Sequence, residues 1–135
     1  MPRYAVLSHD WPMPHFDLLL EDGDVCRTWR LPTWPPVNGM SVERIADHRI
    51  MYLDYDGPVS GDRGTVTTVE RGLFEWQSRS HGELTFDLDC LWPRLVKADD
   101  KRKELPEGRE PPPSSRRISI RDGRLLLSGQ GQPGQ

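Results

Sequence analysis

The chain has 135 residues, which is long enough for one domain with a buried core. Its formal net charge is −3, and residues 1–96 hold 9 Lys and Arg against 15 Asp and Glu. That balance excludes a broad basic surface for sequence-independent duplex binding in this part of the chain. Any contact with nucleic acid there must be local.

The two cysteines, Cys26 and Cys90, are far apart and form no paired-cysteine motif. This spacing argues against a disulfide framework or a structural zinc site and predicts two reduced thiols. The first residues contain no apolar signal-peptide core, and no apolar run approaches the length of a membrane span. We therefore expect a cytoplasmic protein that does not bind membranes.

The first third of the chain predicts three strands. Tyr4 to Ser8 forms the first and His15 to Glu21 the second, and Asp22-Gly23 can then adopt the positive φ values of a tight hairpin. Val25 to Leu31 returns antiparallel, with its two faces equally able to point inward. The proline-rich segment Pro32 to Gly39 must be a loop.

The next segment is ambiguous at its start. Ser41 can cap a helical turn, but we favour a strand for Val42 to Ala46, which leads into a polar cluster at His48. The glycine-rich segment Gly57 to Gly64 carries a hydroxyl and a guanidinium. It either only turns the chain or helps to bind an anion.

The middle of the chain reads as further short strands. We predict a strand from Thr65 to Glu70, a turn at Arg71-Gly72 and a returning strand from Leu73 to Trp76. A polar loop, Gln77 to Gly82, precedes the alternating segment Glu83 to Cys90, which is typical of a half-buried antiparallel strand.

The last part of the chain combines a charged segment with a hairpin. Residues 97–117 have a composition that resists burial, so we expect a flexible insertion there, which is either a solvated loop or a phosphate-seeking arm. Residues 118–127 form a closing hairpin around Asp122-Gly123, and residues 130–135 a frayed tail. The whole chain, 1–135, is predicted to be a single all-β domain, mainly antiparallel. About eight short strands with tight turns and few short helices favour a compact closed or nearly closed β-barrel, with a ligand inside it or at its mouth.

Three side chains predict a metal site. On an extended strand, His15 and Asp17 share one face, and a short proline-containing loop can bring His9 back beside them. Two imidazoles and one carboxylate suit a divalent metal with open positions. The pattern alone leaves zinc, manganese and iron open, so an iron oxygenase is one alternative. Glu21, on the same face, can fix the tautomer of a ligand imidazole.

A second group of residues suits a phosphate. His48, Tyr52 and the nearby Arg49 or Arg63 all donate hydrogen bonds, and arginine can do so in a fork. The plain alternative is a surface histidine in a polar turn. Five tryptophans can stack on bases: Trp11, Trp29, Trp34, Trp76 and Trp92. For Trp29 and Trp76, which lie in predicted strands, core packing is the better interpretation.

The spaced motifs of residues 4–91 resemble, in order, the 3′-phosphoesterase domain of bacterial DNA ligase D. The motifs are His9-x5-His15-x-Asp17-x3-Glu21, Thr28-Trp29-Arg30-Leu31-Pro32, Ala46-Asp47-His48-x3-Tyr52-x3-Asp56-Gly57, Ser60-Gly61 and Gly64-Thr65-Val66.

This resemblance implies a β-barrel enzyme of non-homologous end joining that removes a 3′-ribonucleoside and then a 3′-phosphate from DNA ends. Manganese is the implied metal, with zinc as an alternative, and His9, His15 and Asp17 fall on its ligands. His48 and Tyr52 fall on residues that hold or activate the scissile phosphate. The implied partners are DNA or RNA 3′ ends and other end-joining proteins, and we expect a monomer.

Three positions depart from the family pattern. Leu19, Thr33 and Met40 stand where the family has basic residues that contact phosphate. Four arginines are candidates to replace them: Arg30, Arg44, Arg49 and Arg63. Arg44 lies four residues before His48, on a strand face of the same parity as Met40. The alternative is a catalytically degenerate module that binds a metal and nucleic-acid ends without hydrolysis.

Overall fold

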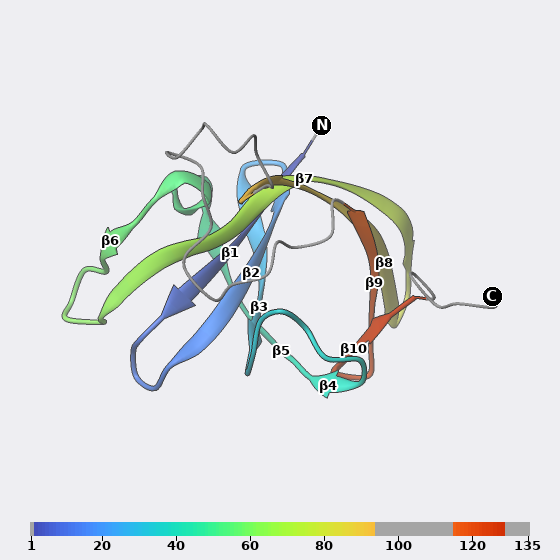
Figure 1. Ribbon diagram of the computed structural model, residues 1–135, viewed down its shortest axis with the longest axis horizontal. Coiled ribbons are helices and arrows are strands. Elements are labelled where there is room, and N and C mark those ends of the chain that lie inside the picture. The colour runs from blue at the N-terminus through green and yellow to red at the C-terminus, as the bar shows by residue number, and fades with distance from the viewer. Residues whose placement is uncertain (1, 94–114, 129–135) are drawn as a thin grey trace, which may run out of the picture.

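The computed structural model describes residues 2–93 and 115–128, which form one ten-stranded antiparallel sheet and a single short 3-10 helix (Figure 1). The elements are β1 (Arg3–His9), β2 (His15–Asp22), β3 (Val25–Leu31), β4 (Met40–Ser41), β5 (Glu43–Arg49), η1 (Ile50–Asp54), β6 (Gly57–Pro58), β7 (Thr65–Ser80), β8 (Glu83–Trp92), β9 (Ser115–Arg121) and β10 (Arg124–Leu127).

The sheet curls but does not close. Its strand order is β4-β10-β9-β8-β7-β1-β2-β3-β5, with β6 paired to β7. The two edge strands, β4 and β5, follow one another in the chain with only Val42 between them, yet β4 pairs with β10 and β5 pairs with β3. The predicted all-β antiparallel fold is confirmed. The predicted closed barrel is wrong, because the chain crosses between the two edges through a covalent link and not through a hydrogen-bonded ladder.

Both predicted Asp-Gly hairpins are confirmed. β2 and β3 flank Gly23, whose φ is 68°, and β9 and β10 flank Asp122 and Gly123, whose φ values are 52° and 72°. At Asp122 and Gly123 the two successive positive φ values match a type I′ turn, whose twist suits the strands on either side. In the first hairpin the turn residues are Gly23 and Asp24, and the positive φ is at Gly23. The strand predicted over Val42 to Ala46 is present from Glu43 onward, as the start of β5, while Val42 lies between β4 and β5.

The predicted turn at Arg71-Gly72 is wrong, because β7 runs without interruption for 16 residues. The register with β8 shifts between Arg71 and Gly72, which marks a bulge. A Cβ atom at Gly72 would lie 2.0 Å from the carbonyl oxygen of Asp89. The glycine therefore permits a close approach of two strands. The loop predicted for residues 77–82 is shorter than expected, since β7 continues to Ser80 and the chain turns only at His81 and Gly82.

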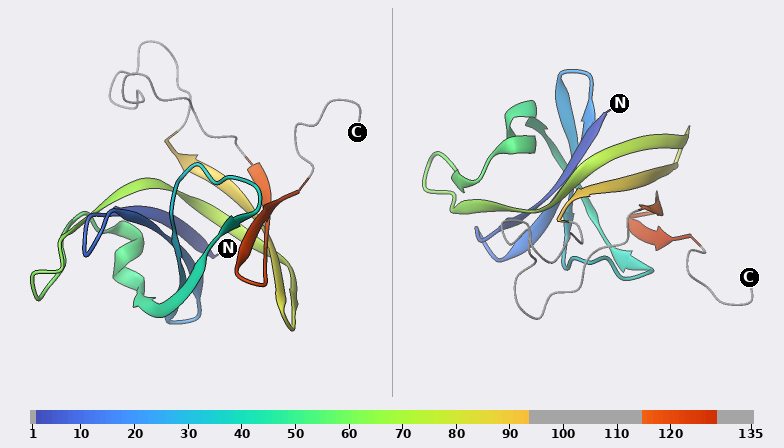
Figure 2. Two further views of the ribbon diagram at one scale, coloured as in Figure 1. Left: turned by 90° about the horizontal axis from the view of Figure 1, so that it is seen from below. Right: turned by 45° about the horizontal axis from the view of Figure 1, so that its top comes forward.

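The sheet carries a hydrophobic cluster on each face where β1, β2 and β3 lie together. The larger cluster fills the inside of the curl with alternate residues such as Tyr4, Leu18 and Trp29. The smaller cluster lies on the outer face, where Leu19 and Cys26 pack under η1 and the segment that leads to β6. Figure 2 shows η1 and β6 on one side of β1 and β2, with β9 and β10 on the other side.

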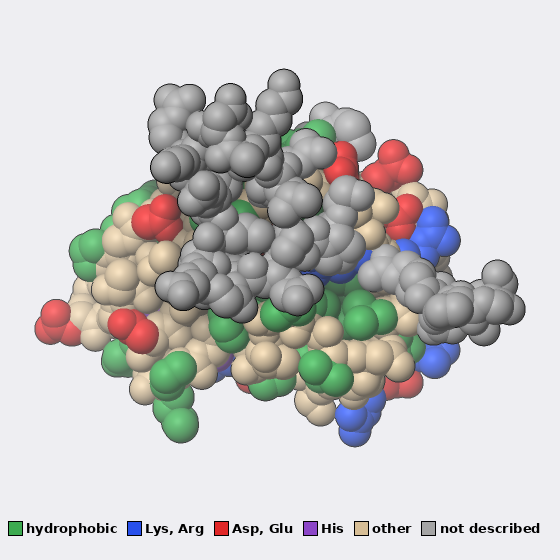
Figure 3. All heavy atoms as spheres, viewed as in Figure 1, with side chains coloured by type: hydrophobic (Ala, Val, Ile, Leu, Met, Phe, Trp, Pro, Cys, Tyr) green, Lys and Arg blue, Asp and Glu red, His purple; other side chains and the backbone are tan. Residues whose placement is uncertain are grey.

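The predicted flexible insertion ends earlier than expected. Residues 115–117 already belong to β9, where the side chain of Arg116 is buried, and the rest of the insertion and the tail lie outside the described residues. Among the described residues, no helix has the length and apolar character that crossing a bilayer requires. On the face shown in Figure 3, the basic side chains of the described residues lie in the right-hand half, next to acidic ones, and the left-hand part carries acidic side chains.

Candidate metal centre

The candidate site is a cleft of about 370 Å³ on the outer face of the sheet. Strands β1, β2, β3 and β5, η1 and the segment before β7 all contribute to its lining. We expected a ligand inside the barrel or at its mouth, but the large buried cluster fills that space. Asp17 faces outward, because its neighbours Phe16 and Leu18 take the inner face.

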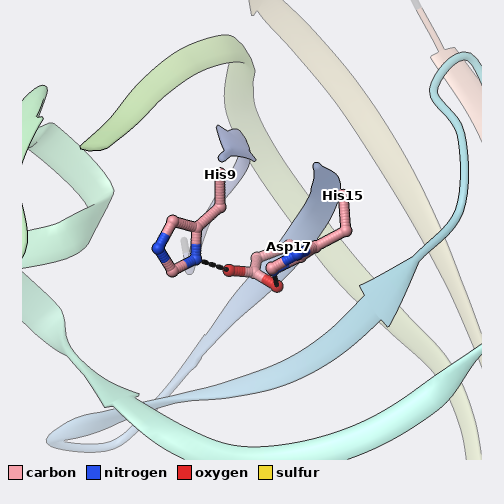
Figure 4. A group of neighbouring side chains, drawn as sticks. All are labelled: His9, His15 and Asp17. Carbon is pink, nitrogen blue, oxygen red and sulfur yellow. Dashed lines mark ion pairs between the residues drawn. The ribbon is translucent and has the colours of Figure 1, made fainter. Parts of the chain in front are cut away.

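His9, His15 and Asp17 come together at the floor of this cleft (Figure 4). His9 ends β1 and pairs directly with His15, which begins β2, and the two ring centroids are 4.9 Å apart. Asp17 follows two residues later on the same face. One candidate ligand atom from each residue lies within 4.8 Å of the other two. The predicted juxtaposition therefore follows from a tight β1–β2 connection.

Backbone carbonyls orient both imidazoles. Nδ1 of His15 lies 2.8 Å from the carbonyl oxygen of Met13, and Nε2 of His9 lies 2.8 Å from that of Arg63. A carbonyl oxygen only accepts hydrogen bonds, so these two ring nitrogens carry the hydrogens. The other ring nitrogens then face Asp17, at 3.6 Å for Nδ1 of His9 and 3.2 Å for Nε2 of His15.

The polar atoms at the floor fit a divalent metal. Nε2 of His15 and Oδ1 of Asp17 are buried and have no hydrogen-bond partner among the described residues, although they lie 3.2 Å apart. In the tautomer set by Met13, both are lone-pair atoms, which a cation would satisfy together. His15 is 8% exposed and Asp17 1%. Leaving such groups unsatisfied costs free energy, so the donor set suits a divalent metal ion.

His48 and Tyr52 lie beside these three residues, as the sequence predicted. Nε2 of His48 is 3.8 Å from Oδ2 of Asp17, while its Nδ1 is 3.2 Å from the carbonyl oxygen of Ala46. The ring of Tyr52, on η1, packs against that of His48 with centroids 5.6 Å apart.

Cys26 is a potential ligand or nucleophile next to this site, since it pairs with His48 across β3 and β5. Burial, and then the nearby charge of Glu21, raises the pKa of its thiol to about 12. Cys26 therefore stays protonated.

Three of the four predicted phosphate-binding arginines line the cleft: Arg30, Arg49 and Arg63. Arg30 lies directly opposite Asp17 in the β2–β3 register, and its Nε is buried without a hydrogen-bond partner among the described residues. The guanidinium of Arg63 donates to the carbonyl oxygen of Ser60 at 2.7 Å. The backbone of Arg63 also holds His9, so the glycine-rich segment helps to orient a candidate ligand.

The structure does not bring Arg44 into the cleft. Between the pairs Cys26–His48 and Thr28–Ile45, β5 has one extra residue, which is a bulge. The bulge reverses the parity of the strand, so Arg44 lies on the inner face while His48 lies on the outer one. The guanidinium of Arg44 packs 5.1 Å from the ring centroid of Trp29 and pairs with Asp47 at 2.6 Å.

The structure also separates Glu21 from the imidazoles. Oε1 of Glu21 accepts a hydrogen bond of 2.8 Å from the backbone N–H of Arg3. The carbonyls of Met13 and Arg63 orient the rings in its place. Sequence reasoning could not find this, because any residue supplies a backbone carbonyl.

The three departures from the family pattern do not line the cleft. Leu19 is fully buried in the smaller cluster below the floor, and Met40 packs against the larger cluster at the far edge of the sheet. Thr33 lies in the loop after β3, outside the cleft lining. The arginines that line this cleft are Arg30, Arg49 and Arg63.

Trp11 was grouped in the sequence only with the other tryptophans that can stack on bases, but the structure places it on the β1–β2 connection, where it lines the cleft. The preceding residue is tied to β7, since the backbone N–H of Thr65 donates to Oδ1 of Asp10 at 2.7 Å. Gly64 allows this approach, because a Cβ there would lie 2.2 Å from that oxygen. The feature of the sequence that relates to this close approach is Gly64, the glycine that ends the 57–64 segment.

The comparisons with known proteins agree with this arrangement. The family model described as the DNA ligase D 3′-phosphoesterase domain matches residues 7–107. A similar curated protein is the multifunctional non-homologous end joining protein LigD of Pseudomonas aeruginosa, 29% identical over 99 residues. The match covers 64% of this chain and 12% of that relative. Because the family model covers most of the chain and its motifs meet in one cleft, the protein belongs to the DNA ligase D 3′-phosphoesterase domain family.

Proposed function

We propose that this protein is a manganese-dependent phosphoesterase that processes 3′-phosphate or 3′-ribonucleotide ends of DNA in end-joining repair. The observation that carries the proposal is the cleft itself, which groups His9, His15 and Asp17 with His48 and three arginines. Membership of the phosphoesterase family supports the reaction class. The substrate, the metal and the repair partners are proposals for this chain.

The residues of the cleft would have different roles, which depend on where each side chain lies. His9, His15 and Asp17 would hold the metal through Nδ1, Nε2 and a carboxylate oxygen. When bound, that ion supplies positive charge that offsets the charge of the phosphoryl oxygens and acidifies water. Arg30 adds a second positive charge from the strand opposite Asp17.

Hydrolysis of a 3′-phosphate forms a bond from a water oxygen to phosphorus and breaks the bond from phosphorus to the 3′ oxygen. The water loses one proton, and the departing 3′ oxygen gains one. Because Ala46 engages Nδ1 of His48, Nε2 is the ring atom of His48 that can exchange a proton in the cleft. The hydroxyl of Tyr52 can donate to a phosphoryl oxygen, which stabilises the negative charge that develops there.

The direct test uses the full chain, stripped of metal with EDTA. Manganese is added back, and hydrolysis of DNA oligonucleotides ending in a 3′-phosphate or a single 3′-ribonucleotide is followed on gels. We expect hydrolysis with manganese and none with EDTA. Metal binding without hydrolysis of either end, or of a panel of small phosphoesters, would instead support the degenerate end-binding module. Oxygen consumption with iron would support an oxygenase.

Replacement of Arg30 by methionine is expected to lower kcat/KM for the 3′-phosphate substrate about 10- to 100-fold. The physical reason is the loss of one charge-assisted hydrogen bond, which contributes roughly 1.5–3 kcal/mol. The matched control is Arg44→Met, because Arg44 packs on Trp29 away from the cleft. We expect that variant to stay within about twofold of the wild type. Equal losses in the two variants would remove Arg30 from phosphate binding.

A further inference from the structure

Trp11 differs from the other four tryptophans in having no aromatic or cationic partner among the described residues. Trp29, Trp34 and Trp92 each pack against an arginine, and Trp76 packs against Phe74, Phe86 and Arg79. The side chain of Trp11 is 43% exposed and lines the same cleft as His9 and Asp17. A large apolar surface is thus left open beside a polar site.

The backbone below Trp11 is held firmly, although its ring is open. Oδ1 of Asp10 accepts the hydrogen bond from Thr65, and the backbone N–H of Asp10 donates to the carbonyl oxygen of Thr65 at 3.4 Å. Gly64 packs against the Cβ atom of Trp11, since a Cβ atom at residue 64 would lie only 2.5 Å from it. An anchored aromatic side chain loses little conformational freedom when it binds a flat ligand.

The exposed fractions place Trp11 at the rim of the cleft and the candidate metal ligands, which would lie next to a bound phosphate, at its floor. Asp17 is 1% exposed and His15 8%, against 43% for Trp11. A terminal phosphate at the floor leaves the nucleoside that carries it near the rim. Nucleobases stack on aromatic side chains whatever their sequence, because every base has a flat π surface.

We propose that Trp11 is a specificity-determining residue that stacks on the base of the terminal nucleotide, so that the cleft selects nucleic-acid 3′ ends over small phosphoesters. This inference rests on the proposed function, because it takes the floor of the cleft as the phosphate site. It also fits the charge of the chain. Residues 1–96 hold 9 Lys and Arg against 15 Asp and Glu, so long-range attraction to the DNA backbone is weak and the end must be held locally.

The test compares two single-stranded oligonucleotides with a 3′-phosphate that differ only in their last residue, a normal thymidine or an abasic sugar. Their dissociation constants are measured by fluorescence anisotropy, in EDTA and in manganese, and their initial hydrolysis rates separately. We expect Trp11→Ala to weaken binding of the thymidine end roughly 5- to 150-fold, which corresponds to the loss of one base–aromatic stack. Binding of the abasic end should change less than about twofold.

Two further variants make the result specific. Trp11→Phe keeps an aromatic face and should restore most of the affinity for the thymidine end. Trp92→Ala is the matched control, because Trp92 is 38% exposed but packs against Arg71 outside the cleft. It should bind both ends like the wild type. Circular dichroism checks that each variant is folded, and if Trp11→Ala is not, Trp11→Leu takes its place as the variant without an aromatic ring.

Failure of this inference can be told from failure of the proposed function. Equal effects of the non-aromatic variant on the two ends, or binding of neither end by the wild type, would overturn the stacking role, even if hydrolysis is observed. A loss confined to the thymidine end would support stacking even if no phosphate were released. In that case the cleft would be an end-binding site and the proposed hydrolysis would be wrong.

Discussion

Asp17→Asn is expected to remove manganese binding and hydrolysis together. The carboxylate is the one negatively charged group of the candidate ligand set, and His9, His15 and His48 all face it within 3.8 Å. Asparagine has nearly the same shape but no charge, so the fold is retained and the attraction for the cation is lost. We expect manganese affinity and kcat/KM each to fall by more than about 100-fold, beyond the range typical of residues that only orient a ligand.

A thermal unfolding experiment tests this without relying on activity. A metal that binds only the folded protein stabilises it by about 2.7 kcal/mol at 100 times its Kd, so the Tm of the wild type should rise with manganese concentration. The Tm of Asp17→Asn should not respond. Asp54→Asn is the matched control, because Asp54 pairs with Arg3 at 2.9 Å, away from the cleft, and should respond like the wild type. A manganese-dependent rise in Asp17→Asn equal to that of the wild type would show that the metal binds elsewhere.

Arg116→Met is expected to destabilise the fold by roughly 3–5 kcal/mol, the cost of breaking a buried ion pair. NH2 of Arg116 lies 3.2 Å from Oε1 of Glu70, and their side chains are 3% and 1% exposed. Glu70 also accepts hydrogen bonds from Tyr4 at 2.6 Å and from the indole of Trp34 at 3.0 Å. Burial, and then the charge of Glu70, raises the pKa of Tyr4, so its phenol stays protonated and donates. Without Arg116, the carboxylate keeps two neutral donors but no positive partner.

The measurement is the midpoint of urea unfolding, with the neighbouring residue as control. Arg117 pairs with Asp87 at 2.7 Å and 3.0 Å on the exposed side of β9, so Arg117→Met should shift the urea midpoint much less than Arg116→Met does. Adding Glu70→Leu to Arg116→Met should recover much of the lost stability, because the unpaired charge is then absent. Equal midpoints for the two single variants would mean that the Arg116–Glu70 pair does not stabilise the fold.

Local pattern was sufficient to predict that His9, His15 and Asp17 lie together. The alternation of β2 places His15 and Asp17 on one face, and a short proline-containing connection brings His9 back beside them. The two Asp-Gly turns were predictable for a similar reason, because a two-residue hairpin needs positive φ at its centre. Each of these features depends on residues that are close in sequence.

Longer-range features were not visible in the same pattern. The bulge in β5 moves Arg44 to the face opposite His48, and no residue type in that segment requires a bulge. Gly72 resembled a turn residue, but it permits a close contact with Asp89 of β8, which is 17 residues further along the chain. Arg116 was grouped with a charged, flexible segment, because its partner Glu70 is 46 residues away.

The sequence by itself therefore determined the all-β class, the hairpins, the grouping of His9, His15 and Asp17, and the family, since these depend on alternation, turn chemistry and the spacing of short motifs. Only the tertiary structure decided which face of the sheet carries the cleft, which arginines reach it and why the curl stays open. Those features depend on strand register and on packing between distant segments. A shift of one residue in register moves every side chain of a strand to the opposite face of the sheet, and the local sequence does not show where such a shift occurs.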